Sequence, residues 1–185
     1  MTEKNTSKYL AVLFSICMLM MLTLFMLRKQ THFAYNVVGI YISYLLFLYF
    51  EYSIHLKIKN SFRVLVMITV LVHLLFGQYF NLYESAGWFD NVLHLFGGFS
   101  FSLFYYEIII STIPLRIGSK IFIFVFIFAL GVTGGVFFEI LEYVLDMLFK
   151  TTNQRGLVDT NLDLIYNLLG AVLAGTWNAL CKRDS

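Results

Sequence analysis

The chain has 185 residues, of which 59% are hydrophobic and only 13% charged, and its mean hydropathy is +0.78. Because a soluble globular domain carries about a quarter charged residues, this chain lacks the polar surface needed to face water on all sides. Its formal net charge is +2 and its basic residues are scattered, which excludes a basic nucleic-acid-binding surface. The composition predicts an integral membrane protein whose main partner is the lipid bilayer.

Six apolar segments are long enough to cross a hydrocarbon core about 30 Å thick as α-helices. In chain order they cover residues 9–27, 33–50, 62–80, 89–112, 121–149 and 162–181. Short connections join them, and the sequence has no internal repeat. These features predict an all-α fold, a polytopic transmembrane helical bundle of about six spans, in a single membrane domain over residues 1–185.

The first and fifth segments have features of their own. The first follows Lys4 and Lys8 and ends without a small-residue cleavage site, so we expect a retained span rather than a removed signal peptide. The fifth is longer than a perpendicular crossing requires. It is therefore expected to tilt, to kink near its glycines or to project beyond the membrane.

The distribution of Lys and Arg between the loops predicts the orientation, because cytoplasmic loops carry an excess of positive charge. One side has nine basic residues: Lys4, Lys8, Lys57, Lys59, Arg63, Arg116, Lys120, Lys182 and Arg183. The other side has four: Arg28, Lys29, Lys150 and Arg155. Both termini are therefore expected in the cytoplasm, and the connections around residues 84 and 153 outside.

Polar side chains on the last three spans share helix faces at a similar depth. They are Asp90 and His94 on the fourth span, Glu139 and Glu142 on the fifth, and Asp159, Asp163 and Asn167 on the sixth. Spacings of three or four residues place each set on one side of its helix. An ionisable group in the bilayer centre costs about 2.5–3.5 kcal/mol on insertion scales. These groups are therefore expected to face one another, water or a ligand, near the non-cytoplasmic side.

Small residues accompany this cluster along the same spans. They are Gly97, Gly98, Gly134, Gly135, Gly170, Ala171, Ala174 and Gly175. Because small residues let membrane helices approach closely, spans four to six are predicted to form one tight unit with the polar cluster at its end.

Acids this close together repel one another unless a cation, retained protons or a basic partner compensates their charge. One solution is a divalent metal ion, which carboxylate and imidazole ligands suit. The candidate ligands are His94, Glu139, Asp159 and Asp163. In an enzyme, Glu142 would be the general base and His94 a second catalytic group. Shared protons are the alternative solution.

Structural interpretations stand beside the functional ones. Asp90 and Asp159 have the positions of helix caps, and His94 could be satisfied by a neighbouring acid. Asn167 could serve as an interhelical hydrogen-bonding residue. If the cluster only fixes packing, Glu139→Gln and Asp163→Asn should mainly lower thermal stability.

Three short motifs on these spans resemble those of known proteins. They are Asp90-x-x-x-His94-x-x-x-Gly98, Glu139-x-x-Glu142 and Asp159-x-x-x-Asp163-x-x-x-Asn167-x-x-Gly170. They resemble the YjdF-type bacterial inner-membrane proteins and, more distantly, the VanZ-like proteins linked to glycopeptide resistance. Asn91 and Glu142 stand where the VanZ-like pattern has Lys and Gln, which favours the YjdF type. The resemblance covers residues 87–177 and implies a multi-pass protein of the bacterial cell membrane, without implying a particular reaction.

Three hypotheses for function follow from the cluster. The first is a metal-dependent hydrolase or transferase that acts on a lipid-linked or envelope substrate. The second is a small proton-coupled transporter, although the polar residues stop at one depth and the sequence has no duplicated half. The third is a non-enzymatic, VanZ-like envelope or antibiotic-resistance protein whose cluster fixes helix packing or binds a partner.

The predicted orientation can be tested at residue 153. A cysteine introduced there should react with a membrane-impermeant thiol reagent added to intact cells. The parent chain, with Cys17 in the first span and Cys181 at the end of the last, gives the background. Labelling only after the cells are opened would place residue 153 in the cytosol and contradict an outward-facing site.

Overall fold

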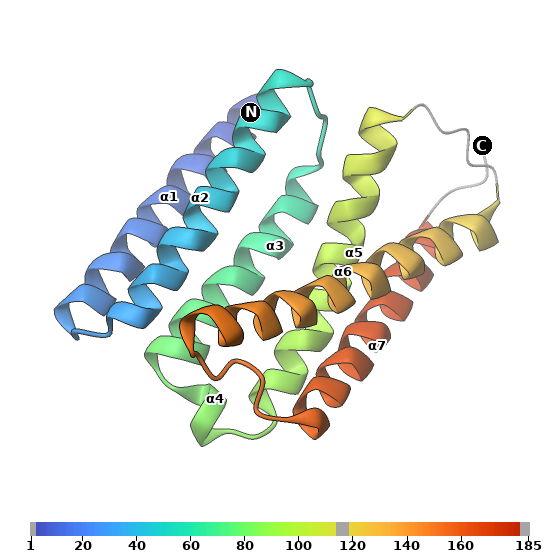
Figure 1. Ribbon diagram of the computed structural model, residues 1–185. Helices are drawn as coiled ribbons and strands as arrows, with labels where there is room; N and C mark the ends of the chain where they lie inside the picture. The colour runs from blue at the N-terminus through green and yellow to red at the C-terminus, as the bar shows by residue number, and fades with distance from the viewer. Residues whose placement is uncertain (1–2, 114–118, 182–185) are drawn as a thin grey trace. The chain divides into compact units, whose positions relative to one another are not determined.

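The structure is a computed structural model that describes residues 3–113 and 119–181, with side chains from residue 5 onward. In these residues all regular structure is helical, with seven α-helices and one π-helical segment, which confirms the predicted all-α class (Figure 1). The helices group into two compact units, Met1–Ala86 and Gly87–Ser185, and each unit is described by itself. The single membrane domain stays a prediction.

Unit 1 contains three long helical spans and one short helix. The elements are α1 (Glu3–Leu27), α2 (Thr31–Ser53), α3 (Asn60–Val72), the π-helix η1 (His73–Tyr79) and α4 (Leu82–Ser85). α1 packs against α2, α3 and η1. The shared core is apolar and rich in methionine, a flexible side chain that fills irregular gaps. It contains Phe14, Met18, Met21, Phe25, Ala34, Val37, Met67 and Leu74.

The third span begins with a buried ion pair that the sequence analysis does not foresee. Arg63, predicted as a loop charge, lies in the first turn of α3 with 2% of its side chain exposed. Its two terminal nitrogens donate to the two carboxylate oxygens of Glu51 over 3.0 and 2.5 Å. A bidentate pair of this kind satisfies the two terminal nitrogens of a guanidinium taken out of water, while Nε of Arg63 makes no hydrogen bond among the described residues. Without Arg63, the basic residues on the predicted cytoplasmic side still outnumber those on the other side.

The third span ends as a π-helix built around His73. Its Nδ1 lies 2.5 Å from the Tyr83 hydroxyl, and its Nε2 lies 3.2 Å from Nδ2 of Asn36 and 3.1 Å from Nε2 of Gln78. Gly77 gives room for the Tyr83 ring, because a Cβ at that position would fall on the ring. His73 is thus held by hydrogen bonds within unit 1.

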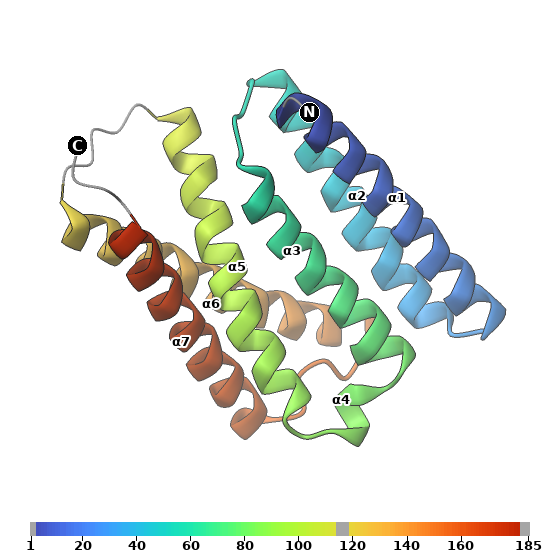
Figure 2. The ribbon, with the colours of Figure 1, turned by 180° about the vertical axis from the view of Figure 1, so that it is seen from behind.

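Unit 2 is a bundle of three helices, α5 (Phe89–Thr112), α6 (Lys120–Phe149) and α7 (Leu157–Cys181). α7 packs against both α5 and α6. α6 has 30 residues in one uninterrupted helix, or about 45 Å, which exceeds the hydrocarbon thickness. Figures 1 and 2 both show α6 lying obliquely across α5 and α7, as the expected tilt of the fifth span would require. Its path through the membrane stays a prediction.

Glycines set the closeness of this packing, as predicted. An added Cβ at Gly98 would lie 2.5 Å from the carbonyl oxygen of Asn167, and one at Gly170 would lie 2.6 Å from the backbone nitrogen of Phe99. A Cβ at Gly135 would lie 2.9 Å from the Cβ of Asn167. The prediction that spans four to six form one tight unit is therefore confirmed, with Asn167 at the point where all three helices meet.

Six helical segments among the described residues are long and apolar enough to cross a membrane, in agreement with the six predicted. The fourth has the predicted bounds. The sixth begins at Leu157 rather than at 162, because the polar residues that precede the apolar run already form its first turns. The orientation stays a prediction. Of the residues it uses, Arg116, Lys182, Arg183 and the Lys4 side chain lie outside the described parts.

Candidate metal centre

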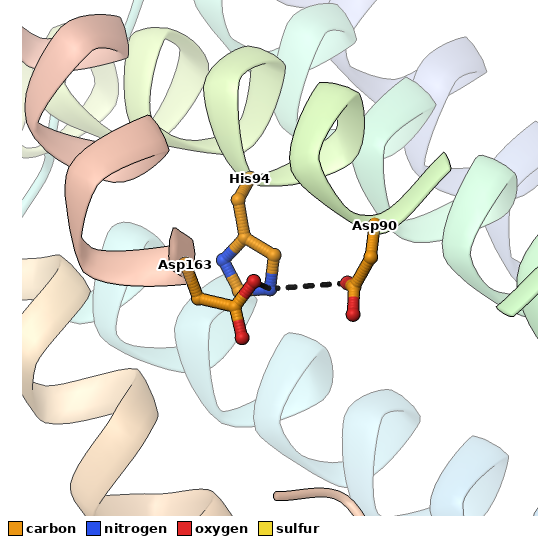
Figure 3. Close-up of side chains that lie close together, drawn as sticks. All are labelled: Asp90, His94 and Asp163. Carbon is orange, nitrogen blue, oxygen red and sulfur yellow. Dashed lines mark ion pairs between the residues drawn. The ribbon is translucent and has the colours of Figure 1, made fainter. Parts of the chain in front are cut away.

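Three of the predicted polar side chains converge at one end of unit 2. Asp90 and His94 project from the first turns of α5, and Asp163 projects from the second turn of α7 (Figure 3). Nε2 of His94 lies 3.3 Å from Oδ1 of Asp90 and 3.5 Å from Oδ1 of Asp163. One ligand atom from each residue lies within 4.8 Å of the other two. The group therefore presents one nitrogen and two carboxylate oxygens to a common space.

Local sequence explains why these residues meet. Asp90 and His94 are four residues apart, as are Asp163 and Asn167, so each pair occupies one face of its helix. Gly98 lets α7 approach α5 at Asn167. Nδ2 of Asn167 lies 3.1 Å from Nδ1 of His94 and fixes the orientation of the imidazole ring. Helix spacing and a glycine contact thus bring the two pairs together.

His94 Nε2 lies farther from the two carboxylate oxygens than a normal hydrogen bond would place it. Charge-assisted N–H···O bonds are normally about 2.7–2.9 Å long, shorter than either separation measured from His94. Oδ1 of Asp163 makes no hydrogen bond among the described residues, although that residue is only 3% exposed. A buried carboxylate oxygen without a donor is costly. A positive group bound to this oxygen would remove that cost.

The two glutamates of α6 flank this group without joining the three-atom set. Glu139 is 5% exposed, and its Oε1 has no hydrogen-bond partner in the described chain. Its Oε2 accepts a hydrogen bond of 3.3 Å from Nε2 of Gln154. Glu142 is half-buried, and it lies close enough to His94 and Asp163 to interact with both electrostatically. Both acids therefore enlarge the group of carboxyl side chains around His94.

A basic partner comes from the connection between α6 and α7. A terminal nitrogen of Arg155 pairs with Oδ2 of Asp90 and lies 3.2 Å from Oδ1 of Asp159. Oδ2 of Asp159 accepts a hydrogen bond of 3.1 Å from the Arg155 backbone nitrogen. Asp159, predicted as a metal ligand, thus caps the start of α7 and is bound to Arg155. The sequence analysis did not assign Arg155 to the site, although it lies only four residues before Asp159 in the sequence.

The rest of this connection is held by Asp146, one turn beyond Glu142 on α6. Its Oδ1 accepts hydrogen bonds from the Thr151 hydroxyl over 2.6 Å and from the backbone nitrogen of Asn153 over 2.9 Å. Its Oδ2 accepts from the backbone nitrogen of Gln154 over 2.9 Å. Gln154 also donates to the backbone oxygen of Glu139 over 3.0 Å. Asp146 is a fully bonded acid that fixes the loop beside the cluster.

The charges of the described cluster do not balance. Its carboxylates belong to Asp90, Glu139, Glu142, Asp159 and Asp163, and the basic groups paired with them are Arg155 and His94. Even with His94 protonated, more acids than bases occupy the end of unit 2. In surroundings of low polarity, such an excess favours a bound cation or retained protons.

The six helical spans and the polar cluster at the end of three of them define a multi-pass membrane protein with a buried Asp–His–Asp group. The chain belongs to the family described as predicted membrane protein (DUF2238), whose model matches residues 9–184. It is similar to an uncharacterised protein of Thermotoga maritima, with 36% identity over 123 residues. That match covers 65% of this chain and 63% of the relative, less than two thirds of its length. No solved structure matches the chain.

Substitutions at Glu139 and Asp146 test whether the polar cluster serves only to stabilise helix packing. Glu139→Gln keeps an acceptor for Gln154 and removes a buried negative charge. The thermal midpoint of the metal-free protein should therefore stay the same or rise. Asp146→Asn, the control, leaves loop donors unsatisfied and should cost about 1–3 kcal/mol. A fall in the midpoint for Glu139→Gln as large as that for Asp146→Asn would favour the packing interpretation.

Proposed function

We propose that the group Asp90, His94 and Asp163 binds a divalent metal ion and that the protein is a membrane-embedded, metal-dependent hydrolase or transferase. The convergence of the three ligand atoms carries this proposal, together with the Asp163 oxygen that makes no hydrogen bond among the described residues. Atoms bound to one ion at about 2.0–2.2 Å are about 3.3–3.6 Å apart in tetrahedral geometry and about 2.8–3.1 Å apart at neighbouring octahedral positions. The two separations from His94, 3.3 and 3.5 Å, lie in the tetrahedral range.

The donor set indicates the kind of ion and site. Two carboxylates favour hard ions and an imidazole favours borderline ones, so Mn²⁺ or Zn²⁺ fits the set better than a soft ion. Three protein ligands leave coordination positions for water or substrate, which is typical of catalytic rather than structural sites. The unbonded oxygen of Asp163 would acquire its missing partner in the ion.

Asn167 would orient the imidazole for this role. Binding through Nε2 of His94 requires a proton on Nδ1, the atom that faces the Asn167 carboxamide. The amide oxygen would then accept that proton in a hydrogen bond, which a rotation of the carboxamide group allows, since its oxygen and nitrogen have nearly the same shape. Second-shell partners of this kind typically change metal affinity about 10–100-fold. Asn167 is thus proposed as a positioning residue.

The flanking residues fit hydrolytic or phosphoryl-transfer chemistry. Glu142, which interacts electrostatically with His94 and Asp163, would accept the proton of the attacking water or hydroxyl group. The position of the site within membrane-spanning helices, near their ends, fits a substrate with a polar head and a lipid part. We therefore propose a lipid-linked or envelope substrate and, from the predicted orientation, an outward-facing site in the bacterial plasma membrane.

Metal content tests this function directly. Protein purified in mild detergent and supplied with Mn²⁺ or Zn²⁺ should retain about one ion per chain after removal of the unbound ions. His94→Ala and Asp163→Asn should each lose it, because each removes one of three ligands. His55→Ala, which changes an exposed histidine of unit 1, should retain it and serves as the matched control. Asn167→Leu should weaken binding about 10–100-fold, and Asn167→Asp should restore it.

Two results would contradict the proposal. Folded wild-type protein that binds neither ion above the level of His94→Ala would exclude a metal site in this group. Equal retention by the wild type and by both ligand variants would place the bound ion elsewhere on the chain.

A further inference from the structure

A cavity of about 370 Å³ lies between α5 and α6 in unit 2. We call it the α5–α6 groove, and its main lining residues are Tyr105, Ile108 and Ile109 of α5 and Leu130, Gly134 and Phe137 of α6. The groove is apolar, and all of its lining residues belong to membrane-spanning segments. Phe137 at its rim is 68% exposed, so the groove is open at the side. Its walls are suited to a hydrocarbon chain.

Gly134 lets Tyr105 of α5 pack closely against α6 in the wall of the groove. A Cβ added at this position would lie 2.5 Å from the ring of Tyr105, so the ring lies directly against the backbone of α6. A larger residue at this position would displace Tyr105 and change the shape of the groove.

Helical register connects the groove to the polar cluster. On α5, Tyr105 follows His94 by eleven residues, or about three turns, so the two side chains share one face about 16 Å apart along the axis. α6 shows the same kind of spacing, because one of its faces carries Gly134, Phe138 and Glu142 at intervals of four residues. The groove and the acids thus lie along the same seam between the two helices.

An aromatic pair occupies the stretch between the groove and the cluster. The ring of Phe101 on α5 lies 5.2 Å from that of Phe138 on α6 and 5.8 Å from that of Tyr105. The seam therefore runs from an apolar cavity, past aromatic rings in contact with one another, to carboxylates and an imidazole. This order of polarity is that of a lipid from its chain to its head.

We infer that the α5–α6 groove holds the hydrocarbon chain of an amphiphilic substrate whose phosphate-bearing head lies at the metal centre. The inference rests on the proposed function for the head and adds a binding site for the chain. Divalent ions commonly bind substrate phosphate together with one or two protein carboxylates. Binding energy from the chain would hold the head in position for reaction.

The experiment compares two photoactivatable lipids in nanodiscs of phosphatidylcholine, with Mn²⁺ present. One is phosphatidate and the other is phosphatidylcholine, and each carries a diazirine midway along one acyl chain. Labelled residues are identified by mass spectrometry of peptides. We expect phosphatidate to label the groove residues several-fold more than the lipid-exposed Val125 of α6, and phosphatidylcholine to show no such preference.

Variants separate the groove from the bilayer surface in general. Thr133→Phe, which fills the groove from its rim, should reduce its labelling by phosphatidate to the level of phosphatidylcholine. Thr176→Phe changes an exposed threonine on α7 and should leave labelling unchanged. Leu130→Trp is a second filling variant in case the first folds poorly. Metal content and thermal midpoint are measured on the same samples to verify that each variant is intact.

The outcomes for the groove and for the metal centre are distinct. The inference would be overturned if both lipids labelled the groove residues no more than Val125, or if groove labelling persisted in both filling variants. Neither result would bear on the measured metal binding. Groove labelling that is blocked by the filling variants supports the chain site. If that labelling is then the same for both lipids and unchanged in His94→Ala, the proposed phosphate head at the metal centre fails although the chain site stands.

Discussion

The main physical constraint on unit 2 is that several carboxyl groups gather in surroundings that solvate charge poorly. Asp90, Glu139 and Asp163 lie on three different helices, and two of them are almost fully buried. Such charges are tolerated in a membrane protein only when they face one another, water or a counter-ion. Arg155 compensates part of this charge at the rim, where it bonds to Asp90 and Asp159. One carboxylate oxygen of Glu139 and one of Asp163 are more deeply buried and make no hydrogen bond among the described residues.

Helix packing and charge are linked at a single residue, Asn167. Its backbone lies against Gly98 of α5, its side chain lies against Gly135 of α6, and its amide contacts the imidazole of His94. The contacts of Asn167 that allow the three helices to pack closely therefore also fix the orientation of the His94 ring. A larger residue at either glycine would separate the helices and move the imidazole from the acids. The seam between α5 and α6 leaves this packed region and opens into the apolar groove.

The fold was largely predictable because hydrophobic length is a strong signal. A run of apolar residues must cross the bilayer as a helix to satisfy its backbone, which fixed the six spans and gave the bounds of α5. Helical spacing also predicted that Asp90, His94 and Asp163 would be neighbours. The bounds of α7 differed because Asp159, Thr160 and Asn161 are polar and yet helical, so hydropathy placed the start of the helix too late.

The finer features depended on tertiary contacts that no local pattern encodes. Spacing could not rank the acids by distance from His94, and the structure brings Asp90 rather than Glu139 or Asp159 into the converging set. Arg155 and Asp90 are 65 residues apart in the sequence. Arg155 reaches Asp90 from a loop whose position is held by hydrogen bonds to Asp146. The π-helix at His73 and the burial of Arg63 arise in the same way, from partners on other helices.

The central claim is that His94 and its two aspartates bind one metal ion, and electron spin echo spectroscopy of Mn²⁺-loaded protein tests it most directly. This measurement detects nitrogen nuclei bonded to the ion. The account predicts nitrogen modulation from a single imidazole in the wild type, and its disappearance in His94→Gln while Mn²⁺ at saturating concentration retains oxygen ligands. A spectrum without nitrogen coupling in the wild type, or one that His94→Gln leaves unchanged, would contradict the assignment of this group as the metal centre.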